Sequence, residues 1–218
     1  MLNHRAVISV LLAVGTSSTA LAGFDEIITF DEVPLGTVVD GLSIKNVGFS
    51  ILGVAERGTA TVAVGPGVTP FVSAPLIEGP TQAGLGLNFA QPVNAFGFGF
   101  AMSVGGTVPN AVVVDVFDPQ GNFLDTFSAS GKAGNRGENF FSSGQIIIQG
   151  LGPIGSAVVN FADYVPTGST LSDGIPIVRF AFDNLGYDFS GVVIPLPTPA
   201  LLGAAGLVGL AARRRRSL

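Results

Sequence analysis

The sequence predicts an all-β fold, an antiparallel β-sandwich of jelly-roll-like kind, with an N-terminal signal peptide before it and a C-terminal hydrophobic helix after it. Two observations predict the sandwich. Short apolar runs rich in Val, Ile and Phe recur between clusters of Gly, Pro, Asn and Asp, which is typical of many short strands joined by tight turns. No run has the periodicity of an amphipathic helix.

The apolar runs define the expected strands, and the stretches between them define the expected loops. We predict strands at residues 27–31, 47–52, 59–64, 85–90, 95–102, 111–117, 123–128, 140–149, 157–161 and 177–189. Longer polar or Gly/Pro-rich stretches at 65–84, 128–137 and 164–175 are predicted to be loops outside the core, where functional residues of a sandwich would lie.

Two short patterns make sharper predictions. In Phe96-Gly97-Phe98-Gly99-Phe100 the period of two places three rings on one sheet face, where they would pack in the core, and leaves glycines on the other. The bare glycine face could let a second sheet or a loop approach closely. The segment 118–122, with Pro119 and Gly121 between two apolar runs, predicts a hairpin.

The N-terminus has the order of a secretory signal peptide. Arg5 precedes an apolar run of about ten residues, which is well short of the roughly 20 that span a bilayer. Ala20 and Ala22 supply the small residues that signal peptidase requires, so we predict cleavage after Ala22 and a signal peptide over residues 1–22.

The C-terminus, residues 192–218, has three parts in sequence. Pro195, Pro197 and Pro199 keep a helix from extending backwards. The apolar stretch 200–212 follows, and a helix from Pro199 would be only about 20 Å long against a hydrocarbon core of about 30 Å. An arginine cluster, expected to stay in the cytoplasm, completes the tail with Arg213, Arg214, Arg215 and Arg216.

This tripartite tail resembles the PEP-CTERM sorting signal recognised by exosortase-type membrane transpeptidases. The usual Pro-Glu-Pro of that family is Pro195-Leu196-Pro197 here, similar to its Pro-Leu-Pro variants. The resemblance implies transient insertion in the inner membrane, removal of the tail, and release to the cell surface or the extracellular space. The alternative is an ordinary stop-transfer helix that anchors the protein permanently.

Residues 23–191 remain as a single domain, and their composition excludes several functions. They hold all fifteen acidic residues but only five of the ten basic ones, which gives about ten net negative charges and argues against nucleic acid as a partner. The chain has no Cys, and its only His, His4, lies in the signal peptide. Catalytic triads, Cys-His dyads and the common zinc sites are therefore excluded from this domain.

The domain also resembles the β-sandwich ectodomains that precede such sorting tails and, more loosely, carbohydrate-binding jelly rolls. The residues that carry this resemblance lie at 28–32, 36–38 and 48–50 near the start, at 95–98 in the middle, and at 180–185 at the end. It implies a non-catalytic surface or matrix protein that could bind exopolysaccharide. The chain has no Trp and only Tyr164 and Tyr187 as tyrosines, so stacking on sugars would rely on these or on an exposed Phe.

A second function class is a secreted glycoside hydrolase that uses a pair of carboxylates. The candidate pairs are Asp31 with Glu32, Asp115 with Asp118, and Asp183 with Asp188. The sequence does not choose among them, and acidic surface residues are commonly just solvated.

Calcium is the one cofactor that we consider, as a structural ion; no other is expected. A sheet that brings the two ends of the domain together would gather oxygen ligands from Asp31, Glu32, Asp183 and Asn184. The alternative is that these residues are solvated or cap strand ends.

Overall fold

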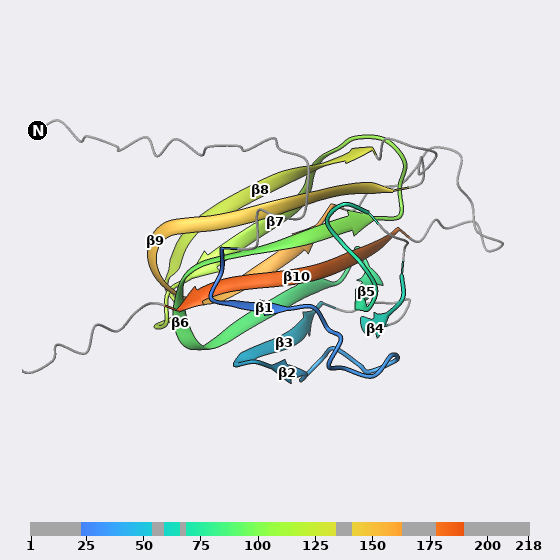
Figure 1. Ribbon diagram of the computed structural model, residues 1–218. Coiled ribbons are helices and arrows are strands. Elements are labelled where there is room, and N and C mark those ends of the chain that lie inside the picture. The colour runs from blue at the N-terminus through green and yellow to red at the C-terminus, as the bar shows by residue number, and fades with distance from the viewer. Residues whose placement is uncertain (1–22, 54–58, 66–68, 134–140, 163–177, 190–218) are drawn as a thin grey trace, which may run out of the picture.

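The fold is all-β and antiparallel (Figure 1), as the sequence predicts. The computed structural model describes residues 23–53, 59–65, 69–133, 141–162 and 178–189. Within these ranges the strands are β1 (Glu26–Ile28), β2 (Ser43–Ile44), β3 (Val47–Leu52), β4 (Thr61–Ala63), β5 (Leu76–Pro80), β6 (Gly84–Met102), β7 (Val108–Phe117), β8 (Phe123–Ala133), β9 (Ser142–Phe161) and β10 (Arg179–Phe189).

Two long strands, β6 and β9, bend and contribute to both layers of a sandwich. The first half of β6 pairs with β3 and with the second half of β9, whereas its second half pairs with β10 and with the first half of β9. The register between β6 and β9 shifts between Asn88 and Ala95, on either side of Pro92, which has no N–H to donate to the ladder. Gly150 and Gly152, both with positive φ, lie at the corresponding bend of β9.

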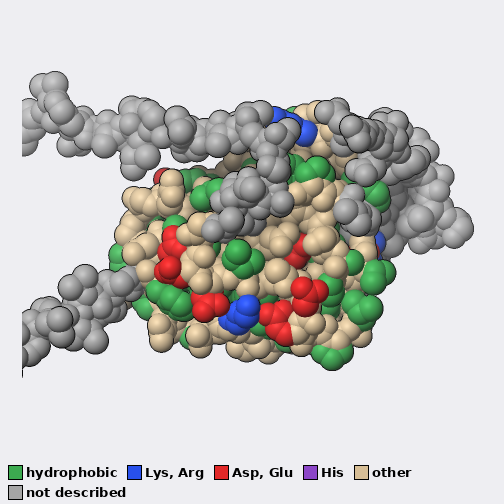
Figure 2. All heavy atoms as spheres, in the orientation of Figure 1, with side chains coloured by type: hydrophobic (Ala, Val, Ile, Leu, Met, Phe, Trp, Pro, Cys, Tyr) green, Lys and Arg blue, Asp and Glu red, His purple; other side chains and the backbone are tan. Residues whose placement is uncertain are grey.

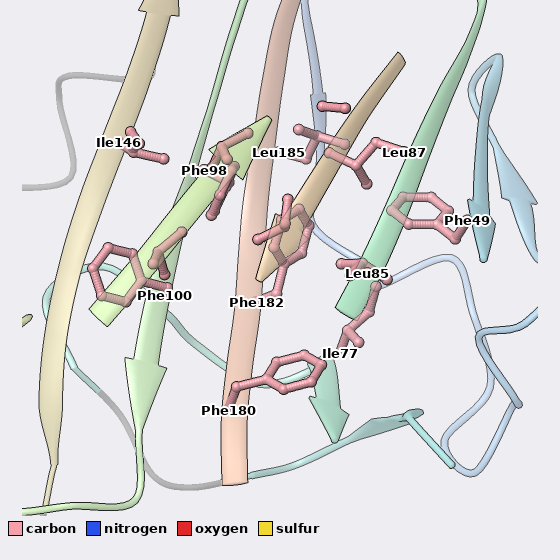
Figure 3. Close-up of a cluster of buried hydrophobic side chains, with 14 of the residues drawn as sticks. Phe49, Ile77, Leu85, Leu87, Phe98, Phe100, Ile146, Phe180, Phe182 and Leu185 are labelled. Carbon is pink, nitrogen blue, oxygen red and sulfur yellow. The ribbon is translucent and has the colours of Figure 1, made fainter. Parts of the chain in front are cut away.

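The two layers enclose a core rich in phenylalanine (Figure 3). Phe96, Phe98 and Phe100 are fully buried, which confirms the prediction from their spacing. The ring of Phe161, in the second half of β9, stacks on that of Phe180 in β10 with centroids 3.9 Å apart. Since these two segments are not hydrogen-bonded neighbours, the contact joins one layer to the other.

The two ends of the described domain pair with each other. β1 runs antiparallel to β10, with Glu26 opposite Tyr187 and Ile28 opposite Leu185. The sheet thus brings the beginning and the end of the domain together, which is the arrangement that the predicted calcium site requires. The hydroxyl of Tyr187 also donates a hydrogen bond to the carbonyl of Lys45, which ties the segment before β3 to the same edge.

The glycine side of β6 is covered by a loop, as the sequence allows. A Cβ added at Gly99 would overlap the backbone carbonyl of Phe71, because the segment 69–75 lies directly against the strand. Val72 and Leu76 form a small buried cluster with Ala101 and Ala181 on this outer side. The loop 69–75 therefore covers the outer side of the layer formed by β10 and the second half of β6.

Asp183 holds the same loop in place. Its Oδ2 accepts hydrogen bonds from the Ser73 N–H at 2.8 Å, from the Ser73 hydroxyl at 3.3 Å and from Asn184 Nδ2 at 3.0 Å. Asn184 Nδ2 also donates to the carbonyl of Phe71. Burial is the main reason that the pKa of Asp183 rises to about 6, and the nearby Asp31 carboxylate raises it further.

Several boundaries predicted from the sequence are wrong. The stretch 65–84 was expected to be a loop outside the core, but it contains β5 and the buried residues Val72, Leu76 and Ile77. The predicted loop 128–137 begins inside β8, which continues to Ala133. The strands predicted at 85–90 and 95–102 are one bent strand, β6, and those at 140–149 and 157–161 belong to β9. The two-residue strand β2 was not predicted.

The structure describes no helix, and so none that is long and apolar enough to cross a membrane, in residues 23–189 outside the gaps given above. The predicted signal peptide, including Ala20 and Ala22, lies outside the described residues. So do the loop 164–175 and the tail with Pro195, Leu196, Pro197 and Arg213 to Arg216.

Candidate ligand-binding face

The outward-facing side of one layer forms a broad surface, which we call the open face. It consists of the outward-pointing residues of β3, the first half of β6, the second half of β9, β7 and β8. Directly opposed residues of antiparallel strands lie on the same side of a sheet. The open face is thus defined by strand register together with the alternation of buried and accessible residues along each strand.

One line of residues crosses all five strands of this face, and we call it the transverse row. The pairings run from Gly48 to Asn88, from Asn88 to Ser156, from Ser156 to Phe117, and from Phe117 to Phe123. The chain neighbours of Asn88 and Ser156 are buried, which places the side chains of the row on the outside. The row thus combines a side-chain amide, a hydroxyl and two aromatic rings on one surface.

A groove of about 380 Å³ lies at the Asn88–Ser156 part of this row. Its walls come from the bend of β6, from the hairpin between β7 and β8, and from β9. The lining residues are Asn88, Phe89, Ala90, Pro92, Asp118, Pro119, Gln120, Gly121, Gly155 and Ser156. Three segments that are distant in sequence therefore meet around one cavity.

The hairpin wall of the groove is held by its own hydrogen bonds. Asp118 Oδ1 accepts from the N–H groups of Gln120 and Asn122, both at 2.8 Å, and Oδ2 accepts from Asn122 Nδ2 at 2.8 Å. Bonds from the Asn122 side chain and backbone are the main cause that lowers the pKa of Asp118. Gly121, with φ 82°, completes the turn and confirms the predicted hairpin.

The hairpin tip packs directly on β9. A Cβ at Gly155 would lie 2.5 Å from Pro119 Cα and 2.8 Å from the Asp118 carbonyl oxygen, so only glycine lets the tip approach this closely. The groove is therefore bounded on this side by backbone that packs closely on β9.

The polar side chains around the groove have unused hydrogen-bonding capacity. Within the described part of the chain, no hydrogen bond engages the side-chain amide of Asn88, that of Gln120 or the hydroxyl of Ser156. Asn88 and Gln120 are also exposed. Each amide offers a carbonyl acceptor and an NH₂ donor, which suits a ligand that carries many hydroxyl groups.

Two of the four predicted calcium ligands, Asp31 and Glu32, have local partners in the structure. Glu32 Oε1 lies 3.3 Å from Lys45 Nζ. Figure 2 shows one face of the molecule, on which several acidic side chains lie near a basic one. Asp31 Oδ2 accepts from the Thr29 hydroxyl at 2.9 Å. Among the described residues no three His, Cys, Asp or Glu side chains are grouped to hold a metal ion.

Among the four predicted calcium ligands, Asp183 is the one with a fully buried carboxyl group. Its Oδ1 has no hydrogen-bond partner in the part of the chain that the structure describes. Asp31 is near enough to raise the pKa of Asp183, as the pairing of the domain's two ends leads one to expect. Calcium prefers six to eight oxygen ligands, and the calcium site stays a prediction.

The carboxylates proposed as a catalytic pair are engaged in local structure. Asp115 Oδ1 accepts from the Thr126 hydroxyl at 2.6 Å, and Asp118 closes the hairpin. Asp188 Oδ1 accepts from the Asp25 N–H at 2.9 Å, next to the pairing of β1 with β10. Asp183 binds the loop 69–75, and Asp31 and Glu32 bind Thr29 and Lys45.

Comparisons with known proteins find distant similarity in fold. No family model and no curated protein sequence matches the chain. Among solved structures, the adhesin domain K1 of Lys-gingipain from Porphyromonas gingivalis W83 is 12% identical, with 76% of this chain and 98% of that chain covered and a TM-score of 0.42. A carbohydrate-binding module, CBM28, specific for non-crystalline cellulose, is 13% identical, with coverage of 72% and 99% and a TM-score of 0.41.

A third solved structure is the enzymatically active domain of tailspike protein 4 from bacteriophage CBA120. It is 18% identical, covers 69% of this chain and has a TM-score of 0.35. The matched region spans only 21% of that structure. All three TM-scores are low, and the similarity does not extend beyond the general fold.

The sequence indicated one wall of the groove but not the groove itself. The hairpin at 118–122 follows from its turn residues. Asn88 and Ser156 are single polar residues within apolar runs, and Gln120 is an ordinary turn residue. Only the pairing of β6 with β9 and the packing of Pro119 on Gly155 bring them together.

Proposed function

We propose that the protein is exported to the cell surface or the extracellular matrix and binds polysaccharide there without catalysing a reaction. The observation that carries this proposal is the groove next to Asn88 and Gln120, whose side-chain amides have no partner among the described residues. Amide groups with unused donors and acceptors beside a groove can hydrogen-bond the hydroxyl groups of a ligand.

Two observations support a non-catalytic role. Residues 23–191 contain no His and no Cys, the side chains most suited to acid–base and nucleophilic catalysis near neutral pH, so carboxylates are the main candidates that remain. The six carboxylates considered above all have hydrogen-bond or ion-pair partners within the fold. A general acid or base must instead be directed at the substrate.

The proposal can be tested by measuring binding of the domain 23–191 to polysaccharides, including the matrix of the producing cells, by affinity electrophoresis. We expect the double variant Asn88→Ala with Gln120→Ala to bind about tenfold more weakly, because each lost hydrogen bond contributes roughly 0.5–1.5 kcal/mol. Both side chains are exposed, so the variant should unfold at the wild-type temperature.

The matched control is Gln149→Ala, which removes an exposed amide from the first half of β9, in the other layer. This variant should bind like the wild type. Failure of the wild-type domain to bind any polysaccharide, its own matrix included, would leave only a structural role.

The export route is the second part of the proposal. We infer that signal peptidase cuts after Ala22 and that an exosortase-type transpeptidase removes the tail near Pro195 to Thr198, after transient insertion in the inner membrane. The support is the small-residue pair at Ala20 and Ala22 and the order of proline motif, apolar stretch and arginine cluster.

Mass spectrometry of the termini of the native protein checks both cleavages. We expect an N-terminus at Gly23 and a product that lacks Arg213 to Arg216. If the arginines are retained in the surface protein, it is permanently membrane-anchored and the sorting proposal is wrong. An N-terminus at Met1 or Leu2 would exclude the signal peptide.

A further inference from the structure

The ionisable groups of the open face define which ligands it attracts. Asp115 lies on this face and Asp118 lines the groove. Of the three basic residues that the structure describes, Lys45 pairs with Glu32 and Arg179 with Glu78, both outside the open face. Lys132, the third, lies opposite Ser143 at the far end of β8. An anionic polymer would therefore meet carboxylates here without a described cation to offset them.

The carboxylates are also poorly suited to bind a cationic polymer. The two oxygens of Asp118 accept three hydrogen bonds within the hairpin, and Asp115 Oδ1 accepts from Thr126. The groups left for a ligand at the groove are the neutral amides of Asn88 and Gln120 and the hydroxyl of Ser156. Their chemistry matches the hydroxyl groups of an uncharged sugar.

An aromatic ring stands at the other end of the transverse row. Phe123 is 58% exposed, and its ring meets that of Phe117 edge-on, with centroids 6.0 Å apart at 73°. Phe117 therefore supports the Phe123 ring while part of that ring still faces water. A flat apolar surface of this kind can cover the C–H face of a hexose ring, which gains free energy from the apolar area removed from water.

The spacing of the row suits a chain that lies across the strands. Neighbouring strands are about 4.8 Å apart, so the three steps from Asn88 through Ser156 and Phe117 to Phe123 span about 14 Å. This length accommodates a few hexose units in a row. Two positions of the open face near the groove are glycines, Gly48 and Gly86. No side chain projects from the sheet there, so a ligand can approach the backbone closely.

We propose that the ligand of the open face is an uncharged polysaccharide, which lies along the transverse row with its hydroxyl groups at Asn88 and Ser156 and one sugar ring against Phe123. This inference rests on the proposed function and adds the charge class of the ligand and the direction of its chain.

The test uses the full chain in its exported form, purified from producing cells. The cells' own matrix polysaccharide is separated by anion exchange into an uncharged and an acidic fraction, and hydroxyethylcellulose and carboxymethylcellulose serve as defined probes. We expect binding to the uncharged fraction, at least tenfold weaker binding to the acidic one, and an affinity that stays the same when salt is raised, because no ion pairs form.

Two variants at one position test the stacking surface. Phe123→Ala should weaken binding about tenfold, whereas Phe123→Tyr keeps a ring and should bind within about twofold of the wild type. Because Phe123 is mostly exposed, both variants should keep the wild-type unfolding temperature.

The outcomes separate this inference from the proposed function. Equal or tighter binding to the acidic fraction, or equal binding by Phe123→Ala, overturns the uncharged chain on the transverse row but leaves polysaccharide binding intact. Binding to neither matrix fraction nor to either probe overturns the proposed function itself.

Discussion

Replacing Gly99 by alanine should lower the thermal unfolding temperature of the domain by roughly 6–12 °C. The added Cβ would overlap the backbone carbonyl of Phe71, and backbone cannot move aside as the end of a long side chain can. Either β6 shifts within the core or the loop 69–75 lifts off. Overpacking of this kind costs about 3 kcal/mol, and each kcal/mol is worth about 2–4 °C in a domain of this size.

A matched control shows that this is not a general effect of alanine in a strand. Gly48 in β3 has its nearest atom, the Asn88 carbonyl oxygen, 3.7 Å from an added Cβ, which is an ordinary contact. Gly48→Ala should therefore leave the unfolding temperature unchanged or slightly higher. If both variants unfold at the wild-type temperature, the loop does not pack on β6 as described. Limited proteolysis should cut Gly99→Ala faster, at residues 69–75.

The second large effect is a pH dependence due to Asp183. Burial raises its pKa in the folded state to about 6, from an ordinary value of 3.8 that applies to the unfolded chain. The folded state therefore holds the proton more tightly. The contribution of this group to stability is fully present below about pH 4 and is lost as the pH rises through about 6. The difference amounts to about 3 kcal/mol at most.

Asp183→Asn should remove this contribution to the pH dependence. The amide oxygen can still accept from the Ser73 N–H and from Asn184, and no charge has to be buried. Relative to the wild type, the variant should gain unfolding temperature at pH 8 and gain little or none at pH 4. A difference between the two proteins that stays constant from pH 4 to pH 8 would contradict the assignment to Asp183.

Calcium provides an informative control in the same experiment. If the predicted site exists, calcium at pH 8 should stabilise the wild type by about 2.7 kcal/mol at a hundredfold excess over its dissociation constant, compared with chelator. Asp183→Asn should then lose that gain, since a ligand oxygen and its charge are missing. Equal unfolding temperatures in calcium and chelator would exclude a structural ion at Asp31, Glu32, Asp183 and Asn184.

Features that depend on residues close together in the sequence could be predicted from it. The period of two in Phe96, Phe98 and Phe100 gave the buried face of β6, and Pro119 and Gly121 gave the hairpin. The all-β class followed from the repeated apolar runs, and the acidic charge of the domain from simple composition. These properties are set by local geometry or by counting, so tertiary contacts do not alter them.

Features that depend on which strands pair were decided by the tertiary structure. Strands were predicted to end at residues 90 and 149. β6 and β9 instead continue past Pro92 and past Gly150 and Gly152 after a bend, because the two halves of each strand pair with different neighbours. Residues 65–84 were assigned to the surface from their Gly and Pro content. β5 is nevertheless buried, since pairing with β10 satisfies its backbone and the segment 69–75 packs on the glycine side of β6.

The candidate site belongs to this second group. Asn88, Gln120 and Ser156 border one groove because β6 pairs with β9 and the hairpin docks on Gly155. The sequence alone determined the class of fold, the core-facing rings and the charge of the domain. Only the tertiary structure decided which isolated polar side chains lie together and that the Asp183 carboxyl group is buried away from water. Both features depend on contacts between segments far apart in the chain.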